Sequence, residues 1–162
     1  MRYVIRENFF RLGEDSTISD DAGNPVYQVD GKVLSLHGTL VVNDMQGNQV
    51  AEVNRRLLSF VPTYEISIHG QEAAEVRKKF FTPFGDRFTI DVPGPDDLEM
   101  DGNLFEHNFV VKQGGKTVAT VSKQWVSLTA TYGVDIASGQ NDLLILTSVL
   151  ALDLAEDAER NR

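Results

Sequence analysis

Three short segments of the chain alternate strictly between apolar and polar residues. Residues 64–68 read Tyr-Glu-Ile-Ser-Ile, residues 88–92 read Phe-Thr-Ile-Asp-Val, and residues 132–136 read Tyr-Gly-Val-Asp-Ile. Successive side chains of a β-strand point to opposite faces of its sheet, so this alternation is typical of strands with one buried face. We therefore predict a chain that is built mainly from β-strands.

An internal repeat extends this prediction along the chain. The segment at residues 47–60 recurs at residues 115–128, and the match continues without a gap from residues 63–68 to residues 131–136. Fainter copies begin at Gly23 and Gly70. All four copies share a glycine, two variable residues, a small or apolar residue and, three positions later, a valine. A glycine in a tight turn supplies a positive φ angle without steric cost, so we interpret each copy as a β-hairpin.

The periodicity changes near Asn141. Either Asn141 or Asp142 can cap a helix whose first turn is residues 143–146. At about 100° per residue, the apolar residues at 143–146, 149–152, 154 and 155 surround the whole helix. A helix that is apolar on all sides must be buried on all sides, which a flat sheet cannot achieve and a closed sheet can. We predict a central helix over about residues 142–157, followed by a charged end in solvent.

Together these segments resemble the LURP-one-related family, whose fold is tubby-like and shared with phospholipid scramblases. The resemblance is carried by residues 115–125 and 132–136, by the first half at residues 44–59, and by the closing stretch at residues 144–153. It implies a single all-β domain over residues 1–162 with one buried helix. The domain would be a closed antiparallel barrel of about twelve strands, with related halves at about 1–90 and 91–136, around the hydrophobic C-terminal helix. The family brings no established enzymatic activity that could be transferred to this chain.

Composition narrows the chemistry that such a fold can carry. The 162 residues include no cysteine, which excludes disulfides, thiolate zinc sites and a cysteine nucleophile. A net charge of −9 argues against general nucleic-acid binding, which needs a basic face. As a helix, the most apolar stretch, residues 143–152, would extend about 15 Å, or about half of a bilayer core. No signal peptide is evident either. We expect a cytoplasmic protein without a transmembrane segment or a cofactor.

An acidic segment is a candidate metal site. Asp97, Glu99 and Asp101, followed by Gly102, resemble the opening of a calcium-binding loop, in which oxygen ligands alternate and a glycine takes the sixth position. The twelfth position of such a loop is a glutamate, and here it is Asn108. We therefore favour a solvated acidic loop and keep the metal site as an alternative. The three histidines lack metal-binding spacing, and His69 before a glycine indicates a turn.

Basic residues fall at matching places in the repeat copies, and they are Arg55, Arg56, Arg77, Lys78, Lys79 and Lys123. In tubby-like domains, basic side chains on the barrel surface hold phosphoinositide headgroups, so the resemblance implies a candidate site for anionic lipid. Phe80, Phe81 and Phe84 could then enter the membrane interface. The net charge of −9 and the interleaved acidic residues argue against this reading.

Three classes of function follow, in order of preference. The first is a non-enzymatic binding or scaffold protein with a protein or ligand partner. The second is a peripheral membrane protein that binds anionic phospholipid or phosphoinositide headgroups through the basic residues. The last is a hydrolase or metal-dependent enzyme, which would need a cleft with convergent carboxylates.

Overall fold

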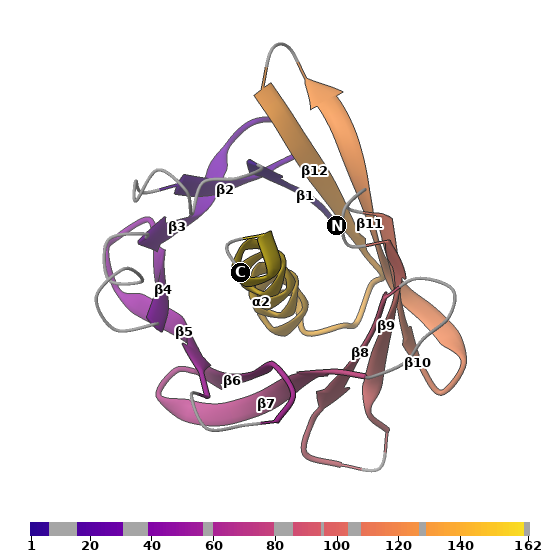
Figure 1. Ribbon diagram of the computed structural model, residues 1–162. Helices are drawn as coiled ribbons and strands as arrows, with labels where there is room; N and C mark the ends of the chain where they lie inside the picture. The colour runs from indigo at the N-terminus through magenta and orange to yellow at the C-terminus, as the bar shows by residue number, and fades with distance from the viewer. Residues whose placement is uncertain are drawn as a thin grey trace.

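In the computed structural model, the described part of the chain forms a closed barrel of twelve antiparallel strands around helix α2 (Asp142–Arg160) (Figure 1). The structure describes residues 1–6, 16–30, 39–56, 60–79, 86–94, 96–103, 108–126 and 129–160. The strands follow one another around the barrel in chain order, and β1 closes it by pairing with both β2 and β12. The predicted fold class is confirmed.

Closure gives each strand a hydrogen-bonded neighbour on both sides, which removes the unpaired edges that an open sheet would expose. The strands are β1 (Arg2–Arg6), β2 (Ser16–Asp20), β3 (Pro25–Asp30), β4 (Thr39–Asp44), β5 (Gln49–Arg55), β6 (Thr63–Ile68), β7 (Gln71–Lys78), β8 (Asp86–Asp91), β9 (Leu98–Asn103), β10 (Asn108–Gln113), β11 (Lys116–Val126) and β12 (Thr129–Ile136). The alternating segments at residues 64–68, 88–92 and 132–136 fall on β6, β8 and β12, as predicted.

Buried side chains from all around the wall fill the space between the strands and the helix. Helix α2 contacts β5, β6 and β7 most extensively, and these strands bury both small and large residues, such as Ala51, Ala74 and Tyr64. Further around the barrel, β8, β9 and β10 contribute Phe88, Met100 and Phe109, all of which are buried. The interior is therefore filled by side chains and is packed as a core.

The internal repeat encodes a turn followed by a β-bulge. Strand pairing slips by one residue at the third position after each repeat glycine, namely at Val26, Val50, Ala73 and Val118. The glycines that begin the copies have positive φ angles: 87° at Gly23, 88° at Gly47, 77° at Gly70 and 79° at Gly115. Two consecutive residues at a bulge oppose one partner residue, and Val50 and Ala51 are accordingly both buried. The hairpin interpretation is confirmed, and the bulge explains why the repeat has an apolar residue at that position.

Two turns at the end of the barrel where α2 begins are built in the same way. Asp20 Oδ1 accepts hydrogen bonds from the backbone N–H groups of Ala22 and Asn24, at 3.0 and 2.8 Å. Asp44 Oδ1 accepts the equivalent bonds from residues 46 and 48, at 3.0 and 2.9 Å. These bonds stabilise the ionised carboxylates, and the pKa values of both aspartates are lowered, chiefly by the bond from the asparagine backbone. The turns fix the strand ends around the mouth of the barrel.

Helix α2 runs through the barrel and is buried on every side (Figure 1). Each side chain at residues 145–155 is at most 7% exposed. The buried hydroxyls of Thr147 and Ser148 donate hydrogen bonds at 2.8 Å to the carbonyl oxygens of Leu143 and Leu144, so their burial leaves no hydroxyl without a partner. Asn141 Oδ1 accepts the N–H of Leu144 at 3.1 Å, which is the expected cap. The predicted central helix is confirmed, and it continues beyond residue 157 to Arg160.

No helix within the described residues combines the length and the apolarity that crossing a bilayer requires. The apolar side chains of α2 fill the barrel, where they pack against the strands. Among the described residues, large apolar side chains that remain exposed belong to three separate segments, at Met1, Met45 and Phe60.

Replacing Leu146 with aspartate should unfold the protein. Leu146 is completely buried, and an unpaired carboxylate there would lose its hydration. Truncating a core leucine alone costs about 2–5 kcal/mol of a total stability of about 5–15 kcal/mol, and a buried charge adds to that loss. The conservative variant Leu146→Met should keep most of the stability. Thermal melts followed by circular dichroism test this, and a Leu146→Asp variant with the wild-type melting temperature would contradict the central position of α2.

Candidate functional site

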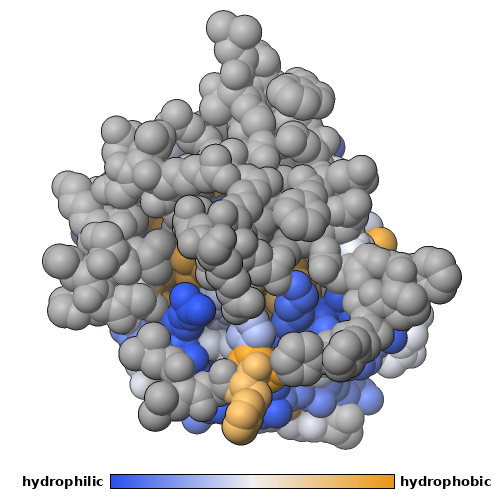
Figure 2. Space-filling view, viewed as in Figure 1, coloured by the Kyte–Doolittle hydropathy of each residue, from blue (hydrophilic) through white to orange (hydrophobic). Residues whose placement is uncertain are grey.

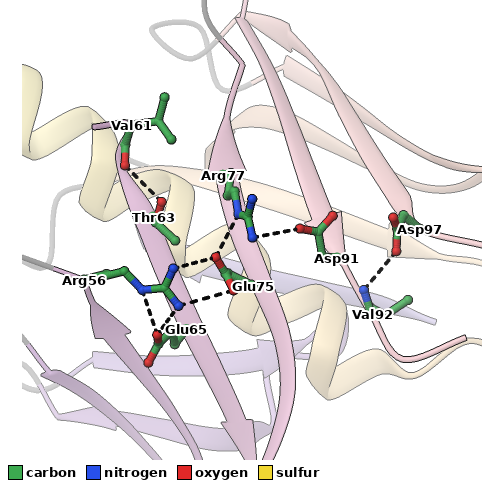
Figure 3. A network of polar contacts seen from close by, with 9 residues as sticks. All are labelled: Arg56, Val61, Thr63, Glu65, Glu75, Arg77, Asp91, Val92 and Asp97. Atoms are coloured by element: carbon green, nitrogen blue, oxygen red, sulfur yellow. Dashed lines mark hydrogen bonds and ion pairs between the residues drawn. The ribbon is translucent and has the colours of Figure 1, made fainter. Parts of the chain in front are cut away.

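Carboxylates contact three of the basic residues that the sequence singled out, namely Arg56, Arg77 and Lys79, on the outer face of the barrel. Arg56 Nε lies 3.0 Å from Glu65 Oε1, and Arg56 Nη1 lies 3.0 Å from Glu75 Oε1 (Figure 3). Arg77 contacts Glu75 at 2.8 Å and Asp91 at 3.5 Å. These residues lie on or next to the neighbouring strands β5–β8, so strand pairing places opposite charges side by side.

The same arrangement continues onto β9. Lys79 Nζ lies 3.1 Å from Glu99 Oε1, and Arg87 Nε lies 2.5 Å from Asp101 Oδ1. We define the outer charge network as the nine residues Arg56, Glu65, Glu75, Arg77, Lys79, Arg87, Asp91, Glu99 and Asp101. It holds four cations and five carboxylates and therefore has no excess of positive charge. On the coloured part of the surface in Figure 2, hydrophilic residues lie on both sides of a hydrophobic patch.

The other predicted basic residues lie outside this network. Arg55 is exposed at the end of β5, and Lys78 is half-buried at the end of β7. The side chain of Lys123 lies outside the described part of the structure, as do Phe80, Phe81 and Phe84. The structure thus groups Arg56, Arg77 and Lys79 with acidic partners.

The three carboxylates of the predicted metal site have separate partners. Asp97 Oδ1 accepts a hydrogen bond from the backbone N–H of Val92 at 3.1 Å, while Glu99 and Asp101 belong to the outer charge network. Within the described ranges, no group of three or more His, Asp or Glu side chains is arranged to hold a metal ion. Each of the three carboxylates is therefore accounted for by a contact of its own.

The mouth of the barrel where α2 begins holds a cavity of about 640 Å³. Its wall comes from β3, from the end of β6 and from the connection between β12 and α2. Polar side chains dominate the lining, with a smaller apolar part. The polar residues are Tyr27, His69, Ser138, Gln140, Asn141 and Asp142, and the remainder are Met1, Ile68, Ala137, Gly139 and Leu143.

Asp142 is the acidic side chain of this cavity, and a tyrosine holds it in place. The hydroxyl of Tyr3 donates a hydrogen bond to Asp142 Oδ2 at 2.7 Å. Burial, and then this bond, raise the pKa of Tyr3. The pKa of Tyr27 is raised as well, by burial first and by the negative charge of Asp142 second. Tyr3 on β1 therefore orients the carboxylate, and the negative charge of the carboxylate acts on Tyr27 in the cavity wall at β3.

Ser138, His69 and Asp142 line the same cavity but do not form a catalytic triad in the described contacts. Such a triad requires hydrogen bonds from serine to histidine and from histidine to aspartate. Among the described contacts, no hydrogen bond of either kind joins these three side chains, and Asp142 Oδ2 instead accepts a hydrogen bond from Tyr3. His69 lies in the β6–β7 turn with a φ of 51°, followed by Gly70, which agrees with its expected place in a turn.

Sequence reasoning did not identify this cavity. It named Asp142 only as a candidate helix cap and did not single out Tyr27. Tyr3 and Asp142 are 139 positions apart in the chain, and they meet only because β1 pairs with β12 immediately before α2 enters the barrel. An aspartate at the start of a fully buried helix was the one available signal.

Comparisons with known proteins identify relatives over almost the full length of the chain. The family model for LURP-one-related proteins matches residues 1–153. An uncharacterized protein of Bacillus subtilis, YxjI, is 31% identical over 153 residues, which cover 93% of this chain and 90% of that protein. The X-ray structure of the Arabidopsis thaliana protein AT5G01750 superposes with a TM-score of 0.65 at 14% identity, covering 99% of this chain and 91% of the other. That structural likeness shows the fold.

Anionic vesicles should bind the protein no better than neutral vesicles. The described cations of the outer charge network already face carboxylates, so they add little attraction to an anionic surface. Co-sedimentation at low salt with phosphatidylserine-containing and phosphatidylcholine vesicles measures this. An Arg77/Lys78/Lys79→Gln variant, with its fold checked by circular dichroism, should pellet like the wild type. Pelleting of the wild type that requires anionic lipid and is lost in the variant would contradict this prediction.

Proposed function

The chain belongs to the LURP-one-related family, and we propose that it is a non-enzymatic binding protein whose ligand occupies the cavity at the mouth of the barrel. One observation carries the proposal: α2 fills the interior, and a cavity of about 640 Å³ lies where the helix enters. A volume of about 640 Å³ is within the range of about 300–1,000 Å³ for small-molecule sites. The ligand would be a small molecule.

The lining of the cavity supports recognition of a polar molecule. Side chains from β3, the β6–β7 turn and the start of α2 converge on one space although they are far apart in the chain. Ile68 and Leu143 supply apolar surface, while Gln140 and Asp142 supply groups that can fix the orientation of a ligand. The site is held by fixed turns and by a cap on the helix, so little ordering would be needed on binding.

The chemistry of the site supports binding without catalysis. Enzymatic acid–base or nucleophilic chemistry needs a nucleophile and a base within hydrogen-bond reach of one another. Among the described residues of the cavity, Asp142 accepts a hydrogen bond from a tyrosine hydroxyl, and no hydrogen bond joins His69 to Ser138. The side chains are thus placed to contact a ligand from separate directions.

Anionic lipid remains a second candidate, and it has less support from the described residues. It depends on Arg55, Lys78 and Lys123 together with the cations of the outer charge network. The network's carboxylates offset its cations, whereas the cavity needs no change in the structure to accept a ligand. We therefore propose the mouth of the barrel as the ligand-binding site.

A thermal-shift screen of small polar metabolites tests the proposal. A ligand that binds the folded protein raises its melting temperature in proportion to the logarithm of its concentration. Gln140→Trp should fill part of the cavity and abolish the shift. Gln46→Trp is the matched control, because Gln46 is exposed in the β4–β5 turn and does not line the cavity. Mass spectrometry should recover the ligand unchanged after incubation.

Three results would contradict the proposal. The screen could yield no ligand, or the Gln140→Trp variant could respond like the wild type while the Gln46→Trp control behaves normally. Conversion of the bound compound into a product by the wild type, lost in Gln140→Trp, would show an enzyme at the proposed site.

A further inference from the structure

The charge of the mouth cavity indicates which class of ligand it suits. Acidic side chains elsewhere on the barrel wall meet cations: Glu75 contacts Arg56 and Arg77, and Glu99 contacts Lys79. Within the described part of the chain, Asp142 forms no ion pair with a Lys, Arg or His side chain, although it is half-buried. A partly desolvated carboxylate without a cation gains most from a ligand that brings one.

The carboxylate is also oriented for this purpose. Tyr3 is 4% exposed, and its hydroxyl holds Asp142 Oδ2 at 2.7 Å. Among the described contacts, Asp142 Oδ1 accepts no hydrogen bond, so one oxygen is fixed and the other is available to a donor. Charge-assisted hydrogen bonds from an ammonium or guanidinium group to such an oxygen are the strong type.

A tyrosine ring lines the same cavity as the carboxylate. Tyr27 is half-buried and lines the cavity, and the charge of Asp142 contributes to the raised pKa of its hydroxyl. The face of a tyrosine ring attracts a cation within about 6 Å of the ring centre. A carboxylate and a tyrosine that line one cavity suit an organic cation better than a simple anion.

The other charged groups near the mouth do not cancel this preference. The Met1 nitrogen donates a hydrogen bond to the carbonyl oxygen of Ile136 at 2.6 Å, and it forms no ion pair with Asp142 among the described contacts. The positive end of the α2 dipole favours a carboxylate at the helix start, but it corresponds to only about half a charge. His69 is exposed at the rim of the cavity.

We propose that the mouth cavity binds a small organic cation, with its ammonium group against Asp142 and the ring of Tyr27. This inference rests on the proposed function and names the class of its ligand. Tyr3 acts as a positioning residue, because it contacts the carboxylate and not the ligand.

Pairs of molecules that match in shape and differ in charge test the inference. We would titrate the full chain with choline and its neutral isostere 3,3-dimethylbutan-1-ol, and with putrescine and 1,4-butanediol, and follow binding by NMR. At least one cation should bind saturably and at least tenfold more tightly than its neutral counterpart. Asp142→Asn should lower the affinity for that cation at least tenfold. Asp21→Asn, the same change on an exposed turn residue, should leave the affinity unchanged.

Variants of Tyr27 provide a second measurement should Asp142→Asn lower the stability. Tyr27→Phe keeps the ring and should keep the binding of the cation, whereas Tyr27→Leu should weaken it severalfold. Equal affinities for the cation and its neutral counterpart, or full binding by Asp142→Asn, would overturn the inference and leave the proposed function in place. Absence of saturable binding by both cations at millimolar concentration would also overturn it. The proposed function would fail with it only if the metabolite screen found no ligand of any charge.

Discussion

Burial of α2 on every side is the constraint on which the rest of the structure depends. The helix is buried around its full circumference over residues 145–155, so no single layer of sheet could cover it. A closed barrel supplies that cover and at the same time pairs both sides of every strand. Buried side chains from different parts of the wall, such as Ala51, Tyr64 and Phe88, fill the space between the strands and the helix.

Because the interior is filled, the surfaces available for binding lie at the ends and on the outside of the barrel. On the outside, strand pairing brings cations and carboxylates together, as at Arg77 between Glu75 and Asp91, so the described charges offset one another. At the mouth, the helix must enter between turns that cannot close over it, and the cavity lined by Tyr27 and Asp142 results. The element that stabilises the fold therefore also supplies the carboxylate of the candidate site.

Local patterns predicted the strands, the hairpins and the buried helix, and the family resemblance implied the twelve-stranded barrel, but neither predicted the site. Strict alternation at residues 64–68 and the apolar circumference of the helix each reflect the burial of one segment, so they can be read from the sequence alone. The contact between Tyr3 and Asp142 depends on the register of β1 against β12, which no local pattern specifies. The acidic partners of the basic residues could not be predicted for a related reason: Arg56 and Glu75 are 19 positions apart and become neighbours only through the pairing of β5, β6 and β7.

Hydrogen exchange of the backbone amides tests the dependence of the barrel on its helix most directly. If α2 fills the barrel and stabilises it, the amides of residues 145–155 can exchange only when the whole barrel opens. They should then exchange as slowly as the core amides of β6, and urea should accelerate both groups with the same slope. Exchange of the helix amides that is clearly faster than that of β6, with little response to urea, would show that the helix leaves an intact barrel and would contradict the account.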